Sequence, residues 1–266
     1  MTDFLFLILL ILGACVGSSL CCQVRRFSKK KKPKWSQCEH CKKKLTWRDK
    51  VPILSWVALG GRCRYCKEKI GVLELTCEIG GALAFVTLFL FWPIELGGTR
   101  GIADGDIKSV VLFVLALGFL SLLGYLAILD IRKREVPQRA LCELIVLGGL
   151  FWILREAFYG GSMDTDVLSL LLGIVILAGL YFVLYKISKE KLVGGAEWMV
   201  GAAMALMLAK WELALLCLVI SNVAAAVIIL NIKSFLNKKI EQVPMLIFLL
   251  LGFLLTLSIF FDFYVG

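Results

Sequence analysis

Long apolar runs recur along the whole 266-residue sequence, and they constrain its fold more than any other feature. Of all residues, 60% are apolar, and the mean hydropathy is +0.87. A soluble domain of this size has too little interior to bury so much apolar surface. The runs extend for roughly 16 to 22 residues, close to the length of about 20 that crosses the hydrocarbon core of a bilayer. We therefore predict an all-α, polytopic membrane protein.

We predict about eight transmembrane helices from these runs. The first run, Phe4–Leu20, ends in Leu20-Cys21-Cys22, which is not the small-residue cleavage site of a signal peptide, so we expect this helix to be retained. The expected division is a first transmembrane helix at 1–24, a cytosolic loop at 25–70 and a transmembrane core at 71–266. The expected spans are 4–22, 72–92, 109–129, 140–158, 167–186, 198–209, 213–231 and 244–262.

Positive charge is concentrated after the first span. Residues 25–70 hold 16 Lys and Arg against three acids, and such an excess marks the cytosolic side of a membrane protein. This placement accounts for the charge, so we do not expect nucleic acid as a partner. We expect the run Lys29–Lys32 to contact anionic lipid headgroups. The other loops then expected on the cytosolic side are also basic: 131–139, 187–197 and 232–243.

The same loop contains two Cys-x-x-Cys pairs. Cys38 and Cys41 are followed, after 21 residues, by Cys63 and Cys66. Four thiolates at this spacing can bind one tetrahedral zinc ion, and four protein ligands leave no open position for catalysis. Two alternatives are four unpaired cysteines or two redox pairs, although no thioredoxin-like pattern flanks them. We predict a structural, zinc-ribbon-like loop between the first two helices.

A single acid marks the end of the third apolar run. Asp130 follows Val110–Leu129 and precedes the basic segment Arg132–Arg134 and Pro137. An ionisable residue at the lip of a membrane helix is a candidate functional residue. The alternative is that Asp130 only ends a helix at the cytosolic surface, with the basic residues as anchors.

A catalytic role for Asp130 requires a second acid. Glu197 is expected on the same side of the membrane, after two glycines that allow close backbone approach. Its alternative role is to favour the dipole at the start of a helix. The loop with Asp104 and Asp106 is expected on the opposite side, and we expect a supporting role for Glu74 and Glu78. Sidedness therefore favours Glu197.

These motifs as a set resemble the bacterial type IV prepilin peptidases, over nearly the whole chain. One departure falls at the second catalytic motif of that family, Gly-x-Gly-Asp, where this chain has Gly194-Gly195-Ala196-Glu197. A smaller departure is at Ser19 and Cys21, in and just after the first matching segment. The matching segments are Gly17-Ser18-Ser19-Leu20 with Arg25-Arg26, both cysteine pairs, Leu45-Thr46-Trp47, Pro52-Ile53-Leu54-Ser55, Glu74 and Glu78, Asp130 with Pro137, and Val243-Pro244.

The resemblance implies a membrane aspartic endopeptidase of the bacterial inner membrane. It implies that Asp130 and Glu197 share one proton and activate a water, and that the substrate is a prepilin or pseudopilin whose short basic leader is removed. Many members also N-methylate the new terminus with S-adenosylmethionine. The extra methylene of Glu197 suggests a rival, a catalytically impaired homologue that binds prepilins. A further rival hypothesis is a small ion-coupled transporter. This hypothesis predicts acids near the middle of the membrane and two half-chains that repeat one another.

Overall fold

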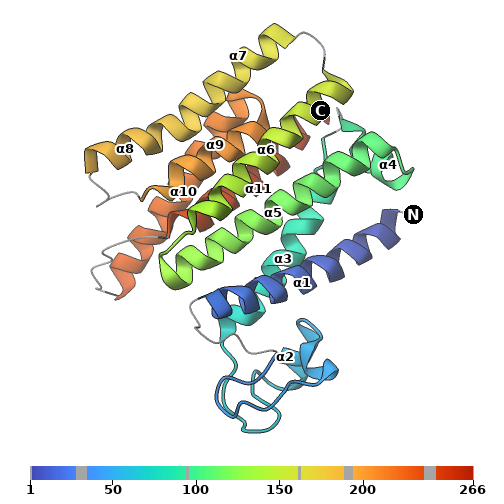
Figure 1. Cartoon of the computed structure of the whole chain (residues 1–266), viewed down its shortest axis with the longest axis vertical. Coiled ribbons are helices and arrows are strands. Elements are labelled where there is room, and N and C mark those ends of the chain that lie inside the picture. The colour runs from blue at the N-terminus through green and yellow to red at the C-terminus, as the bar shows by residue number, and fades with distance from the viewer. Residues whose placement is uncertain are drawn as a thin grey trace. The chain divides into compact units, whose positions relative to one another are not determined.

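The computed structural model describes residues 2–27, 35–93, 96–160, 163–188, 194–236 and 244–265 (Figure 1). The run Lys29–Lys32 and parts of two predicted basic loops, 189–193 and 237–243, lie outside these ranges. The chain forms two compact units, Met1–Thr87 and Leu88–Gly266. The regular structure of the described residues is helical, with two isolated antiparallel bridges, which confirms the predicted all-α class.

The first unit contains α1 (Thr2–Phe27), a long loop with η1 (Trp47–Lys50) and α2 (Leu54–Ala58), and most of α3 (Val72–Leu90). Glycines allow α1 and α3 to approach closely. A Cβ on Gly17 would collide with the carbonyl oxygen of Cys77, and a Cβ on Gly13 with that of Gly81. Small residues at such positions are typical of helix pairs in membranes, because they bring the two backbones into van der Waals contact.

The second unit is a bundle built around a short apolar helix. The helix α9 packs against α6, α11 and the π-helical turn η3, while α11 also packs against α5 and α10. The elements are α4 (Gly98–Ala103), α5 (Ile107–Lys133), α6 (Gln138–Tyr159), α7 (Met163–Ile174), η3 (Val175–Gly179), α8 (Leu180–Ser188), α9 (Ala196–Leu208), α10 (Trp211–Leu236) and α11 (Met245–Val265).

Two local features shape this bundle. The segments α7, η3 and α8 follow one another without a break and form one long helix with a π turn inside it (Figure 1). The short helix α9 ends at Ala209, whose left-handed backbone (φ 57°) leads into α10. The core between the helices is apolar, and its fully buried members include Leu126, Leu129, Ala203 and Met204.

Five helical segments of the described chain are long and apolar enough to span a membrane, which confirms a multi-pass protein. The other three predicted spans coincide with α6, α9 and α11. The segments Ala196–Leu208 and Met245–Ile259 are apolar but shorter. The helix α6 carries four charged residues near its two ends: Arg139, Glu143, Arg155 and Glu156. The predicted count of eight spans therefore stays a prediction. The five long segments are Thr2–Phe27, Val72–Leu90, Ile107–Lys133, Val167–Ser188 and Trp211–Asn231.

Candidate functional site

The two cysteine pairs of the first unit lie on two hairpins with the same backbone geometry. In each hairpin the first cysteine donates its N–H to a carbonyl five residues later, at 3.0 Å from Cys38 and 2.8 Å from Cys63. An isolated antiparallel bridge closes each hairpin, Gln37 with Lys44 and Arg62 with Lys69. The residue after each second cysteine is left-handed, Lys42 with φ 56° and Lys67 with φ 59°. The two hairpins therefore present their cysteine pairs on the same kind of turn.

The four thiols of the predicted metal site come together. The Sγ atoms of Cys38, Cys41, Cys63 and Cys66 all lie within 4.8 Å of one another, and the Sγ atoms of Cys38 and Cys66 are 3.8 Å apart. Tetrahedral bonds of about 2.3 Å to zinc would place two sulfurs about 3.8 Å apart. The backbone N–H of Cys66 hydrogen-bonds the Cys63 sulfur and, despite burial, lowers the pKa of the Cys63 thiol to about 7. These residues form a four-cysteine cluster that could hold a metal ion.

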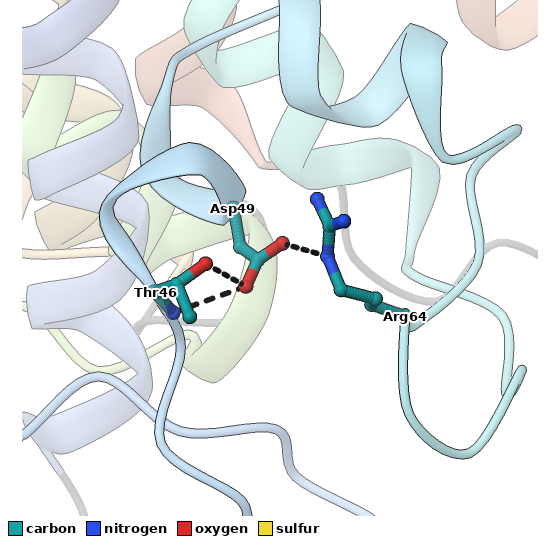
Figure 2. Close-up of polar contacts among 3 residues, drawn as sticks. All are labelled: Thr46, Asp49 and Arg64. Carbon is teal, nitrogen blue, oxygen red and sulfur yellow. Dashed lines mark hydrogen bonds and ion pairs between the residues drawn. The ribbon is translucent and has the colours of Figure 1, made fainter.

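An ion pair joins the second hairpin to η1 (Figure 2). The Nε of Arg64, between Cys63 and Cys66, donates to Asp49 Oδ1 at 2.8 Å. The N–H and hydroxyl of Thr46 donate to Asp49 Oδ2 at 3.0 and 2.6 Å. Burial raises the pKa of Asp49, but the hydrogen bonds from Thr46 and Arg64 outweigh it and leave that pKa below its ordinary value. The Asp49 carboxylate is thus fully engaged in holding the cysteine loop together.

Two acids of α3 make contacts within the first unit, one with the cysteine loop and one with α1. Glu78, only 8% exposed, accepts the Ile53 N–H at 2.7 Å, and Glu74 pairs with Arg25 of α1 at 3.1 Å. Ile53 has φ 62° and ψ −56°, and the Leu54 N–H donates to the Pro52 carbonyl at 2.6 Å. This is a γ-turn of the strained, positive-φ type. The two glutamates, for which we predicted a supporting role, make structural contacts within the first unit.

In the second unit, Asp130 lies at the start of another helix. It occupies the last turn of α5, where Arg134 in left-handed conformation (φ 53°) ends the helix. Its Oδ2 accepts the backbone N–H of Leu246 at 3.2 Å, and Leu246 belongs to the first turn of α11. A carboxylate at a helix N-terminus is stabilised by the unpaired N–H groups and the helix dipole. Asp130 therefore connects two segments that are 116 residues apart.

Glu197 occupies a similar position on α9. It lies in the first turn of that helix and is 8% exposed. The backbone N–H groups of Glu197 itself, Gly194 and Ala196 attract the carboxylate. Its Oε2 atom is nonetheless buried and has no hydrogen-bond partner among the described residues. A buried polar atom without a partner is costly, and such atoms often mark a site that acts on something else.

Asp130 and Glu197 lie within electrostatic range of one another. Asp130 is in the last turn of α5 and Glu197 in the first turn of α9, and α11 packs against both helices. Both acids face helix N-termini, and Pro137 and Gly194-Gly195 flank the segments that carry them. Two neighbouring carboxylates can share one proton, and this arrangement supports general acid–base chemistry on a water.

Asp104 and Asp106, between α4 and α5, are remote from this pair. Asp106 caps the first turn of α5, where it accepts the Ser109 N–H at 3.0 Å and the Ser109 and Tyr159 hydroxyls at 2.8 and 3.1 Å. The Ser109 hydroxyl is the main cause of the lowered pKa of Asp106. Because α5 has 27 residues and is therefore about 40 Å long, Asp106 and the neighbouring Asp104 cannot meet Asp130.

Sequence reasoning missed the polar groups around the acid pair. The backbone N–H of Leu246 leaves no trace in the sequence, although Pro244 marks the nearby start of α11. The Ser221-Asn222 pair in an apolar run was a visible signal, because polar side chains in membrane helices usually have a role. Asn222 donates to the hydroxyl of Tyr181 at 3.0 Å, and Tyr181 lies within electrostatic range of Glu197.

Comparison with known proteins points to one family. The model of the bacterial peptidase A24 N-terminal domain matches residues 11–92. An enzyme of Escherichia coli O78:H11, named a type 4 prepilin-like proteins leader peptide-processing enzyme, is 45% identical over 58 residues, which are 22% of each chain. Two proteins named prepilin leader peptidase/N-methyltransferase align over longer stretches. That of Pectobacterium carotovorum is 29% identical over 59% of this chain and 50% of its own. That of Aeromonas hydrophila is 26% identical over 72% and 59%.

These alignments cover less than two thirds of the relatives' own length. No solved structure matches the chain. The sequence matches extend over both units, and several curated relatives carry the same name. Residues 11–92 therefore match the bacterial peptidase A24 N-terminal domain family, and the chain as a whole is similar to proteins named prepilin leader peptidase/N-methyltransferase.

Proposed function

We propose that this protein is a membrane aspartic endopeptidase that removes the short basic leader from type IV prepilins or pseudopilins. The cut would be made at the cytosolic face of the bacterial inner membrane. The observation that carries the proposal is that Asp130, at the end of α5 and bonded to the start of α11, lies within electrostatic range of Glu197 at the start of α9. The names of the relatives support the substrate class.

The acid pair would work as a unit with one shared proton. Two carboxylates that share a site do not both carry full charge readily, so one would stay protonated while the other is ionised. The ionised member would take a proton from the attacking water, and the protonated member would hydrogen-bond the scissile carbonyl and later protonate the leaving amine. The N-terminal N–H groups of α9 and α11 would hold both carboxylates in place during these transfers.

The cysteine loop would serve this reaction as a structural element. We propose that Cys38, Cys41, Cys63 and Cys66 bind one zinc ion, which would cross-link the two hairpins. The excess of Lys and Arg in residues 25–70 supports a cytosolic loop, and the alternation of basic loops with the apolar runs supports eight spans in all. Exposed aromatic rings covered by cations, such as Trp35 under Lys44 Nζ at 3.8 Å, support contact with anionic lipid headgroups.

The printed names of the relatives extend the proposal to a second reaction. The enzyme would also N-methylate the new amino terminus, with S-adenosylmethionine as the methyl donor. Transfer of a labelled methyl group to the processed prepilin would test this activity separately from cleavage.

One observation favours a second candidate, a catalytically impaired homologue that binds prepilins. Glu197 is one methylene longer than the aspartate that the family motif has at this position. Its carboxylate lies over the start of its own helix, and a Cβ on Gly194 would come within 3.1 Å of Oε2. A misplacement of about 1 Å can cost about 100-fold in rate. The chain would then retain the site but cleave slowly.

Leader removal by purified variants tests the proposed function. The chain in liposomes should cleave a prepilin, and Asp130→Asn should abolish cleavage, because an amide cannot exchange the proton. Asp106→Asn changes an acid at the far end of α5 and should leave the rate unchanged. Undiminished cleavage by Asp130→Asn would overturn the catalytic assignment. Prepilin binding without cleavage by the parent would support the impaired homologue instead.

A further inference from the structure

The helix α8 and the π turn before it lie against α9, the helix that carries Glu197. A Cβ on Gly201 would be only 2.7 Å from the carbonyl oxygen of Leu177, so the backbones are in direct contact. Because the chains run antiparallel here, Tyr181 falls within about one helical turn of Glu197. Three close pairs set this register: Leu177 with Gly201, Phe182 with Trp198, and Tyr185 with Gly195.

Tyr181 is the polar side chain of this face that is fully buried. Its exposed fraction is 1%, and its hydroxyl oxygen is 3.0 Å from Asn222 Nδ2 of α10. The same Nδ2 atom donates to the Leu218 carbonyl at 2.8 Å. A carbonyl oxygen only accepts, so the atom that faces it must be the amide nitrogen, and this fixes the orientation of the Asn222 side chain.

The direction of the Asn222–Tyr181 bond follows from that orientation. Asn222 donates, so the Tyr181 oxygen accepts, and the phenol proton must point elsewhere. Within the described ranges no acceptor for this proton is found, although a buried tyrosine hydroxyl usually donates to a partner. The phenol therefore has an unused donor in a water-poor environment, where leaving it unpaired is costly.

Glu197 has a hydrogen-bond acceptor that lacks a donor. Its Oε2 atom is buried and has no hydrogen-bond partner among the described residues. Its charge acts on Tyr181, and the other ionisable group that does so is Cys217 of α10. An unused donor and an unused acceptor thus occur within electrostatic range of one another, on two helices whose backbones are in contact.

We propose that Tyr181 is a positioning residue for the second acid. A rotation of the Glu197 side chain would bring its Oε2, which has no partner among the described residues, to the Tyr181 hydroxyl as a hydrogen-bond acceptor, while Asn222 holds the phenol ring in place. This proposal rests on the proposed function for its effect on catalysis. The π turn η3 ends at Gly179, two residues before Tyr181, and π turns are frequent at functional sites.

The bond would hold the Glu197 carboxylate in one position, although the backbone N–H groups at the start of α9 also attract it. With Oε2 held by Tyr181, the other carboxyl oxygen would face Asp130 and the substrate. The phenol would make this bond in the ground state and keep it during the reaction, so its removal should lower kcat and leave KM nearly unchanged. Loss of a residue that only fills space would not lower kcat while leaving KM unchanged.

Tyr181→Phe removes the hydroxyl and keeps the ring, and Tyr125→Phe on α5 is the matched control. In the prepilin cleavage assay we expect kcat to fall roughly tenfold for Tyr181→Phe, with KM and the Tyr125→Phe variant unchanged. Asn222→Leu removes the hydrogen bond that holds the Tyr181 ring and leaves the Tyr181 side chain itself unchanged. It should also lower kcat, by a smaller factor than Tyr181→Phe. Wild-type kcat in both Tyr181→Phe and Asn222→Leu would overturn the proposal.

An infrared measurement keeps this result separate from the proposed function. Protein with ¹³C-labelled glutamate has a carboxyl band that Glu197→Gln removes. In Tyr181→Phe this band should shift because Glu197 loses one hydrogen bond, and in Tyr125→Phe it should not. If the parent does not cleave prepilin, the proposed function fails, yet a shifted band still supports the bond. An unmoved band in Tyr181→Phe would overturn it whatever the activity.

Discussion

The cysteine loop of the first unit and the acid pair of the second unit are built in opposite ways. The loop gathers four thiols, with 28 residues separating Cys38 from Cys66. The carboxylates of Asp49 in the loop and Glu78 in α3 both accept hydrogen bonds. The acid pair gathers Asp130, Glu197 and the Leu246 N–H from three distant helices. It leaves one buried carboxylate oxygen without a partner among the described residues. The hydrogen-bonded carboxylates of Asp49 and Glu78 fit a structural role, whereas the Oε2 atom of Glu197 can accept a hydrogen bond from a second group.

The largest effect should follow from breaking the cysteine cluster. Because a structural zinc contributes its binding free energy to folding, Cys38→Ser should reduce bound zinc from about one equivalent to less than half. It should also expose residues 35–70 to proteases. Metal analysis and limited proteolysis of purified protein measure these changes. Cys142→Ser, at an exposed cysteine of α6, is the control and should keep the metal. Full zinc content in Cys38→Ser would contradict the comparison.

The second effect concerns the acid pair. Glu197→Asp shortens the side chain to the reach of the family motif, and it should raise the prepilin cleavage rate by roughly ten- to a hundredfold if placement is the defect. Glu197→Gln should be inactive, because an amide cannot take part in sharing the proton. Initial rates of leader removal in liposomes give both results. A Glu197→Gln enzyme as fast as the parent would remove Glu197 from the catalytic pair.

The smallest effect should come from the ion pair between Asp49 and Arg64. A partly exposed pair contributes about 1 kcal/mol or less, so Asp49→Asn should speed the release of zinc to a chelator by about two- to fivefold. Arg64→Gln should have a similar effect. The double variant should be no worse than either single change, because both remove one interaction. Lys50→Gln removes a nearby charge and serves as the control. Additive effects of the two changes would show that the pair does not act as a unit.

The two regions also differ in how far the sequence predicts them. Hydropathy predicts the helices, and the Cys-x-x-Cys spacing predicts the thiol cluster, because both depend on residues near in sequence. The charge pattern favoured Glu197 over Asp106 through sidedness alone. The role of Asp106 as a cap for α5 depends on Ser109 and on Tyr159 from α6, and only the fold brings Tyr159 near. The same holds for the Leu246 N–H and for Tyr181.

The π turn η3 sets the rotational register of the helix segment that follows it. A π turn holds one residue more than an α turn, so α8 faces its neighbours as if a residue had been inserted after α7. One residue corresponds to about 100° of rotation about a helix axis. Loss of any single residue within Val175–Gly179 would restore an unbroken α-helix and rotate α8 by that angle. Tyr181, Phe182 and Tyr185 would then leave α9 together. The length of this one turn thus decides which side of α8 meets the acid pair.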